Sequence, residues 1–228
     1  MTRVKICGLS EIEHALAASQ AGADFLGLVF APSRRQVSTE RALPLVEAVH
    51  SLRTRPIIVG IFANSTAQEI NQIAEHCHLD WVQLSGNETW QYCLEIKKPI
   101  IKVIHIPANR TGDEIQGEIE SGYQLMSKKE VVCLLDSQVG DAFGGTGQVF
   151  NWQMAKEIAD RFPVMVAGGL TPTNVGQLVG AVHPWGVDVS TGVETNGRKD
   201  ASKISAFIEA VRKADKRISQ PTKLNKAY

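Results

Sequence analysis

The chain has a run at residues 131–136 that reads VVCLLD, and another at residues 3–7 that reads RVKIC. Each run is short and mostly apolar, and each ends in a side chain that can exchange a proton, Asp136 in the first and Cys7 in the second. A segment containing glycine follows each of them. We therefore expect two buried strands of a parallel sheet whose carboxyl ends carry a carboxylate and a thiol.

Six more runs of this kind occur along the chain, separated by amphipathic stretches of helical period. This alternation, without an internal linker, predicts a single (β/α)8 barrel over residues 1–216. The alternative is an open, doubly wound sheet, but no GxGxxG segment follows the first run. Residues 217–228 are polar and are expected to form a flexible tail. The further strand-like runs are residues 25–30, 57–62, 81–84, 100–105, 164–167 and 186–190.

Composition restricts the class of protein. The 24 basic residues balance 24 acidic residues, so the net charge favours neither nucleic acid nor a membrane surface as a partner. No apolar run approaches the roughly 18 residues that cross a bilayer, and the amino-terminal residues lack the apolar core of a signal peptide. The four cysteines have no paired spacing. We expect a cytoplasmic protein with reduced cysteines and no metal site.

Two glycine-rich turns follow the last two expected strands: AGGL at residues 167–170 and STG at residues 190–192. Successive amide N–H groups in such turns can surround an anion, and many (β/α)8 barrels bind a phosphate between these two loops. The alternative is that each glycine only ends a strand. The pair of turns predicts a phosphorylated small molecule as substrate. A third segment, FGGTG at residues 143–147, is expected to be a flexible lid or an ordinary surface loop.

Alternation along the strands selects side chains that face the barrel interior. Asp188 is on the interior face of its run, where a carboxylate needs a basic partner or the hydroxyls of a ligand. Lys5 shares a face with Cys7 and either supports catalysis or holds the barrel centre together electrostatically. Arg34 and Arg35 follow the second strand and could clamp a carboxylate, although a solvated loop pair is the more ordinary interpretation.

Nine segments of the chain, taken together, resemble the phosphoribosylanthranilate isomerases. Each segment alone is a weak signal, but they occur in the order of the family and span nearly the whole chain except the tail. The segments are KICG (5–8), GLVF (27–30), SRR (33–35), VGIF (59–62), VQLSG (82–86), LLDS (134–137), GGTG (144–147), AGGL (167–170) and DVSTGVE (188–194).

The resemblance implies a (β/α)8 barrel and an Amadori rearrangement in tryptophan biosynthesis. In that reaction N-(5-phosphoribosyl)anthranilate becomes 1-(2-carboxyphenylamino)-1-deoxyribulose 5-phosphate. Cys7 corresponds to the general base of the family and Asp136 to its general acid. Arg35 corresponds to the arginine that holds the anthranilate carboxylate. Ser85 is a departure, because the family commonly has histidine there. The remaining correspondences are Asp188, near the sugar hydroxyls, and Gly169, Thr191 and Gly192, in the backbone phosphate site.

The chemistry accounts for these residue types. An acid that protonates the ring oxygen must hold its proton when substrate is bound, so Asp136 needs a raised pKa. The base must be a thiolate, which the Lys5 ammonium would help to maintain at Cys7. The substrate nitrogen accepts the electrons, so neither a metal nor an organic cofactor is expected.

Two alternatives to this function stay open. One is a related aminoaldose-phosphate isomerase of the histidine-biosynthesis type, which uses two aspartates, and Cys7 argues against it. The other is a non-catalytic barrel that binds a phosphorylated metabolite. The oligomeric state is expected to be a monomer or a homodimer.

Overall fold

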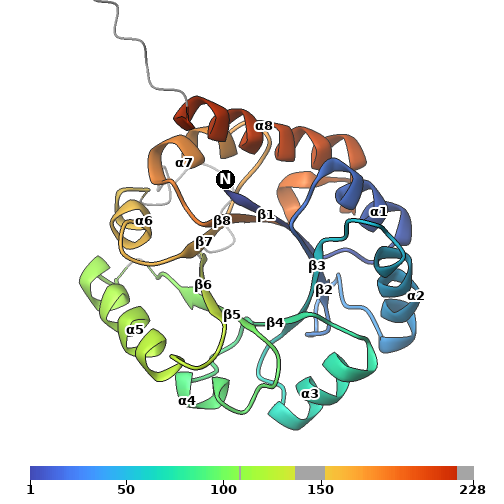
Figure 1. Cartoon of the computed structure of the whole chain (residues 1–228), viewed down its shortest axis with the longest axis horizontal. Helices are drawn as coiled ribbons and strands as arrows, with labels where there is room; N and C mark the ends of the chain where they lie inside the picture. Colours follow the sequence, from blue (N-terminus) through green and yellow to red (C-terminus); the bar gives the residue numbers. More distant parts are fainter. Residues whose placement is uncertain (108, 137–151, 220–228) are drawn as a thin grey trace, which may run out of the picture.

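The computed structural model describes residues 1–107, 109–136 and 152–219. Eight parallel strands form a closed barrel, in chain order from β1 to β8 (Figure 1). The predicted (β/α)8 barrel is therefore confirmed, and the open sheet is excluded because β1 pairs with β8. The strands are β1 (Arg3–Cys7), β2 (Phe25–Val29), β3 (Ile57–Phe62), β4 (Trp81–Leu84), β5 (Ile100–His105), β6 (Val131–Asp136), β7 (Val164–Ala167) and β8 (Gly186–Val189).

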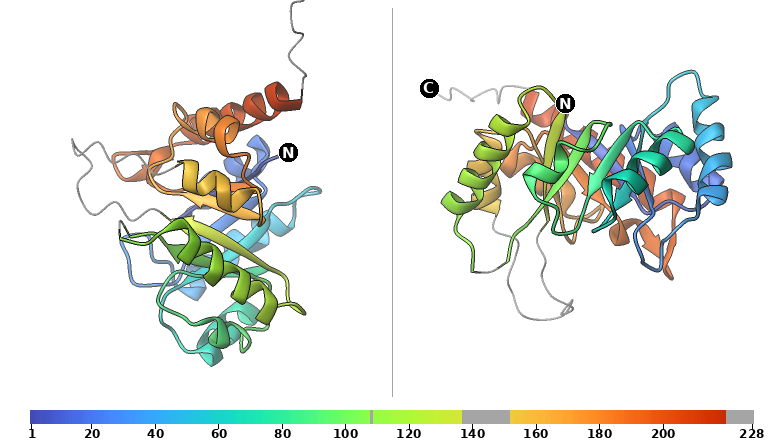
Figure 2. Two further views of the ribbon diagram at one scale, coloured as in Figure 1. Left: turned by 90° about the vertical axis from the view of Figure 1, so that its left-hand side faces the viewer. Right: turned by 90° about the horizontal axis from the view of Figure 1, so that it is seen from below.

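The helices form a ring around the barrel, and α8 packs against both α7 and α1 to complete it (Figures 1 and 2). The helix α8 continues through Ser219, so residues 217–219, which were expected to belong to the tail, form its end. No described helix is long and apolar enough to cross a membrane. The helices are α1 (Ile12–Ala21), α2 (Thr39–His50), α3 (Ala67–His76), α4 (Trp90–Cys93), α5 (Gly112–Leu125), α6 (Trp152–Ala159), α7 (Val175–Val182) and α8 (Ala201–Ser219).

Helix starts follow from local chemistry. Thr66 caps α3 by accepting a hydrogen bond from the backbone N–H of Glu69 at 3.2 Å. Thr111 and Glu114 form a reciprocal capping box at the start of α5.

After β8 the chain forms a short helix, η1 (Thr191–Val193), and a two-stranded hairpin of β9 (Glu194–Thr195) and β10 (Arg198–Lys199). This hairpin brings additional charged side chains to the end of β8.

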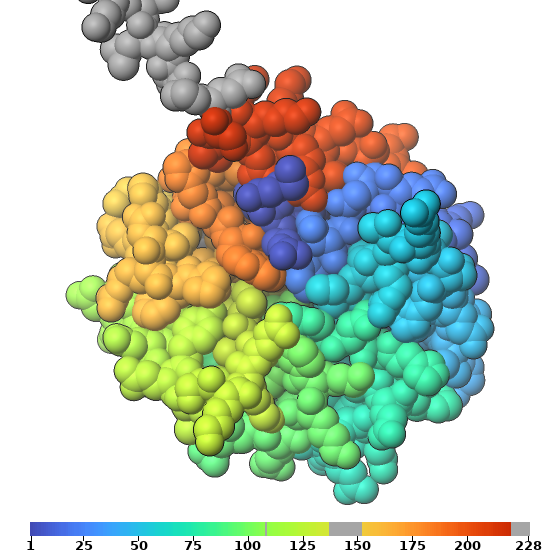
Figure 3. Space-filling view, in the orientation of Figure 1, coloured from blue at the N-terminus to red at the C-terminus, as the bar shows by residue number. Residues whose placement is uncertain are grey.

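The strands alternate between two apolar layers, as buried parallel strands should. Outward-facing residues pack against the helices, and this layer includes the buried Cys133. Inward-facing residues fill the barrel, where Phe25 meets Trp81 edge to face at 5.8 Å. Side chains occupy the middle of the ring at the face shown in Figure 3. The interior becomes polar at Lys5, Gln83 and Asp188, which are buried.

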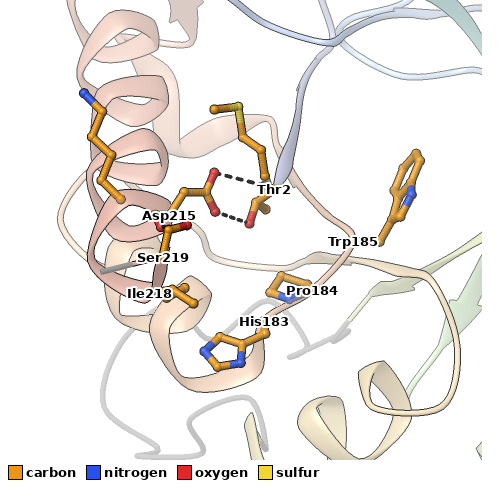
Figure 4. Close-up of a pocket in the computed structure, with 9 residues that line it drawn as sticks. Thr2, His183, Pro184, Trp185, Asp215, Ile218 and Ser219 are labelled. Atoms are coloured by element: carbon orange, nitrogen blue, oxygen red, sulfur yellow. Dashed lines mark hydrogen bonds between the residues drawn. The ribbon is translucent and has the colours of Figure 1, made fainter. Parts of the chain in front are cut away.

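The amino terminus is fastened to α8. Thr2 donates its backbone N–H, at 3.0 Å, and its hydroxyl, at 2.7 Å, to the carboxylate of Asp215 (Figure 4). A hollow of about 530 Å³ adjoins this contact and is lined also by His183 and Trp185. Thr2 precedes β1 and Trp185 precedes β8, so the hollow lies at the amino ends of the strands. The candidate site lies at the opposite ends.

Candidate active site

Cys7 and Asp136 both lie at the carboxyl ends of strands and face the barrel interior. Asp136 is two residues after Leu134, whose side chain is in the inner layer, and Cys7 is two residues after the interior Lys5. Both residues are half-buried, between the packed interior and the solvent. The structure thus brings the predicted thiol and carboxylate to one end of one barrel.

Asp188 lies between the two sides of the site. Its Oδ1 atom is 3.0 Å from Nζ of Lys5, and both side chains are buried. The predicted partner for the Asp188 carboxylate is therefore Lys5, which holds β1 to β8 through an ion pair. Only β7 lies between β8, which carries Asp188, and β6, which ends in Asp136.

The surroundings of Asp136 favour its protonated form. Burial raises the pKa of the carboxyl, and the nearby Asp188 charge raises it further, while His105 acts in the opposite direction. His105 is the register partner of Asp136 on β5. The direction of the pKa shift is the one predicted for a carboxyl that must donate a proton at neutral pH.

The surroundings of Cys7 act against ionisation of the thiol. Burial raises the pKa of Cys7, and the charge of Asp188 adds to this effect. Lys5 and Lys199 both lower the pKa, in the direction expected of a supporting cation, but burial outweighs them. The surroundings therefore favour the thiol of Cys7 over the thiolate.

Arg35 is held by a carboxylate and is not simply solvated, whereas Arg34 pairs with the same carboxylate from an exposed position. The Nε atom of Arg35 donates to Oε1 of Glu194 at 2.7 Å, and its Nη2 atom donates to Oε2 at 3.2 Å. Arg34 donates through Nη2 to Oε2 of the same carboxylate at 2.6 Å. The loop after β2 is therefore joined to the hairpin after β8, across the end of β1.

The two predicted phosphate-binding loops are adjacent. Gly169 follows β7 with φ of 63°, a left-handed conformation that glycine adopts without strain. A Cβ atom on Gly192 would overlap the carbonyl oxygen of Leu170, so the loop after β8 touches the loop after β7 at this glycine. Thr191 and Gly192 lie in η1, where their amides are at the rim of the barrel. The arrangement agrees with the prediction, and the binding of phosphate remains a prediction.

Two interior residues were missed from the sequence. Gln83 on β4 donates through Nε2 to Oγ of Ser85 at 3.0 Å, and His105 at the end of β5 lies with Nε2 3.1 Å from the Ser85 carbonyl oxygen. The buried atoms Gln83 Oε1 and His105 Nδ1 have no hydrogen-bond partner among the described residues. Strand alternation would have found both, since Gln83 is two residues after the interior Trp81. Although Ser85 stands where a histidine is common, a different histidine, His105 on the next strand, thus lies beside it.

The proposed lid, residues 143–147, lies outside the described residues, as does Ser137 of the LLDS segment. The described site therefore consists of the ends of the strands and the loops after β1, β2, β4, β7 and β8.

The family model for N-(5'-phosphoribosyl)anthranilate isomerase matches residues 4–210, nearly the whole barrel. The chain belongs to this family. A family member from Dehalococcoides mccartyi is 50% identical over 215 residues, which cover 94% of this chain and 98% of the relative. Another, from Roseiflexus castenholzii, is 46% identical, with 92% of this chain and 98% of the relative covered.

Solved structures of the isomerase family have the same fold. The isomerase of Thermotoga maritima matches with a TM-score of 0.78 at 33% identity, over 93% of this chain and all of that one. A second isomerase structure, in complex with reduced 1-(o-carboxyphenylamino)-1-deoxyribulose 5-phosphate, matches with a TM-score of 0.76 at 32% identity over the same shares. The resemblance stated from the motifs is therefore confirmed, and the chain is an enzyme of this isomerase family.

Proposed function

We propose that this isomerase acts on N-(5'-phosphoribosyl)anthranilate, with Cys7 as its general base and Asp136 as its general acid. The observation that carries the proposal is a carboxyl of raised pKa and a thiol on the same interior face at the carboxyl end of the barrel. A thiol and a protonated carboxyl can together remove one proton and supply another. The names of the relatives give the same substrate, and one relative is a multifunctional tryptophan biosynthesis protein from Phycomyces blakesleeanus.

The substrate has two anionic ends, and we assign each to a different side of the rim. Its phosphate would lie against the amides of Gly169, Thr191 and Gly192, where two loops approach closely. Its anthranilate carboxylate would face Arg35, whose planar fork suits a carboxylate. Oδ1 of Asp188 accepts a hydrogen bond from Lys5, and we propose that the second carboxylate oxygen accepts one from a sugar hydroxyl.

The proton transfers follow from this placement. Asp136 donates its proton to the ribose ring oxygen, the bond from that oxygen to the anomeric carbon breaks, and the substrate nitrogen forms an iminium. The iminium acidifies the proton on C2, which the thiolate of Cys7 removes to give an enolamine. The enolamine tautomerises to the ketone, and a proton transfer from the Cys7 thiol to the Asp136 carboxylate through water restores the starting state. No step requires an electron donor or acceptor other than the substrate.

A fluorescence assay that follows the consumption of phosphoribosylanthranilate tests the function. We expect turnover by the purified chain, with no consumption of the related aminoaldose phosphate of histidine biosynthesis. Turnover of the second substrate alone would favour the alternative isomerase, which the thiol at Cys7 argues against. Binding of a phosphorylated sugar without any turnover would favour the non-catalytic barrel.

The assembly and location belong to the same proposal. We expect a monomer or a homodimer in the cytoplasm, with a phosphorylated small molecule as the ligand. The Thermotoga maritima relative is described as dimeric. Sedimentation of this chain, with and without a product analogue, would distinguish the two assembly states.

A further inference from the structure

Glu194 is a nearly buried carboxylate that meets three cations. Its side chain is 6% exposed. Besides its two bonds to Arg35, it accepts from Arg34 and from Nζ of Lys199 at 2.9 Å. Burial alone would raise the pKa of Glu194, but hydrogen bonds from Arg35, Lys199 and Arg34 lower it to about 2. The carboxylate is therefore charged at neutral pH and can remain paired with these cations.

The contact with Arg35 occupies one edge of the guanidinium group and leaves another edge available. Glu194 takes the edge formed by Nε and Nη2. A guanidinium has five N–H donors in a planar fork, so the end formed by Nη1 and Nη2 keeps two parallel N–H groups. Such a pair of donors is the arrangement that binds a second carboxylate through two hydrogen bonds.

Gly8 places this guanidinium close to the proposed base. A Cβ atom on Gly8 would lie 2.5 Å from Cδ of Arg35 and 3.3 Å from Oγ of Ser190, so Arg35 crosses directly over the residue after Cys7. The positive φ of Gly8, 79°, also suits only glycine without strain. The side chain of Arg35 therefore extends across the end of β1 from the loop after β2.

Lys199 connects the same carboxylate to the loop after β8. Its Nζ atom donates to the Ser190 carbonyl oxygen at 2.9 Å as well as to Glu194. One carboxylate opposes three cations here, which leaves an excess of two positive charges at the rim. A ligand with a carboxylate and a phosphate has the complementary charge.

We propose that Glu194 is a positioning residue that fixes the Nε edge of Arg35, so that the opposite end of the guanidinium faces the carboxylate of the substrate. This role rests on the proposed function and adds to it the origin of carboxylate specificity. The arginine is pre-organised before the substrate arrives, so binding does not have to order a long flexible side chain.

The test compares two ligands and three variants, E194Q, R35A and R35A/E194Q. Turnover is measured with phosphoribosylanthranilate and with the analogue that lacks the ring carboxylate, N-(5'-phosphoribosyl)aniline. We expect E194Q to raise KM for the first substrate about tenfold, as loss of a charge-assisted hydrogen bond would, with kcat changed little. With the analogue, E194Q and the unchanged enzyme should have equal KM. The double variant R35A/E194Q should be no worse than R35A, because both changes remove the same interaction.

Two further variants separate positioning from folding. E194D keeps the charge on a shorter side chain and should raise KM less than E194Q. R198A is the matched control on the same hairpin, because Arg198 is exposed and, among the described residues, forms an ion pair with Glu11 alone, through Nη2. It should retain the KM of the unchanged enzyme. Thermal unfolding of each variant confirms that the comparison is made between folded proteins.

The results separate this role from the reaction itself. Equal increases in KM for both ligands in E194Q, or additive losses in R35A/E194Q, would overturn the positioning role. Calorimetric binding of a reduced product analogue, with and without its carboxylate, is measured alongside turnover. If the unchanged enzyme binds the analogue but does not turn over the substrate, the proposed reaction fails, and the binding of the two analogues to E194Q still decides the role of Glu194.

Discussion

Burial and charge act in opposite directions at Cys7. Lys5 favours the thiolate, but burial favours the thiol and is the larger effect. In the proposed mechanism the Cys7 thiolate is therefore held against the effect of burial by Lys5 and Lys199, and the iminium that forms next to it would stabilise it further. This arrangement suits a reaction in which the substrate supplies the positive charge.

The first prediction concerns Cys7→Ala. We expect kcat to fall by about 10² or more, because a positioned base is removed while the apolar packing around it is kept. Cys7→Ser should also turn over poorly, since an alcohol is a much weaker base than a thiolate. The kcat of both variants is compared by the fluorescence assay, and circular dichroism checks the fold. Turnover of Cys7→Ala at the rate of the unchanged enzyme would remove Cys7 from the mechanism.

The second prediction concerns the stability cost of Asp136. At low pH the carboxyl of Asp136 is protonated in both the folded and the unfolded state, so its raised pKa does not lower the free energy of unfolding there. Stability is lost as the pH rises through the folded pKa, because the charged form is disfavoured only in the folded state. Asp136→Asn removes this loss, so we expect a higher free energy of unfolding than in the unchanged protein, by an amount that grows from acid to alkaline pH. Urea unfolding at several pH values measures it, and an Asn variant that is less stable at alkaline pH would contradict the burial argument.

Most of the barrel could be predicted at the scale of single elements, because each strand is a short apolar run with turn residues at both ends. Six of the eight strands have the expected bounds, and β2 and β8 each end one residue earlier than expected. The end of α8 could not be predicted in this way, since polar residues are typical both of an exposed helical turn and of a loose tail.

The site was less predictable than the fold. Asp188 and Cys7 followed from strand alternation, which is a local pattern. The contact between Arg35 and Glu194 joins residues that are 159 positions apart, and no local pattern indicates such a partner. The effect of burial on the thiol of Cys7 likewise depends on every element that surrounds it.

Gly192 permits the close approach of the loops after β7 and β8, which gives the third prediction. A methyl group at this position would overlap the Leu170 carbonyl oxygen, which is a backbone atom and cannot rotate away. Gly192→Ala should therefore separate the loops and raise KM by about tenfold, the cost of misplacing hydrogen bonds to a charged phosphate. Gly180→Ala in α7 is the matched control, since no atom lies within 4 Å of its added methyl group. Equal KM in both variants would show that the loop contact does not support substrate binding.

At the scale of the whole molecule, the contact that fastens the amino terminus and the proposed active site lie at opposite ends of the barrel. The amino ends carry the contact between Thr2 and Asp215, which joins the first strand to the last helix (Figure 4). The carboxyl ends carry Cys7, Asp136 and the charged rim. This division is the usual one in (β/α)8 enzymes.

The fourth prediction follows from this division. Asp215→Ala leaves the buried donors of Thr2 without their acceptor, which should cost about 1–3 kcal/mol of folding free energy. The variant should keep its kcat and KM at a temperature where it is folded, because the change is far from the strand ends that carry the site. Thermal unfolding and the fluorescence assay measure the two effects. A loss of turnover in the folded variant would contradict the separation of the two ends.

The fifth prediction, the pH dependence of turnover by Asp136→Asn, tests the central claim most directly. The amide keeps the shape of the carboxyl but cannot deliver a proton, so kcat should fall by roughly 10² or more while a product analogue still binds. In the unchanged enzyme kcat should decline at alkaline pH, as the raised pKa of Asp136 is passed and the acid loses its proton. The variant should lack that decline. A folded Asp136→Asn enzyme with full kcat and the same alkaline decline would contradict the claim that Asp136 is the acid that opens the sugar ring.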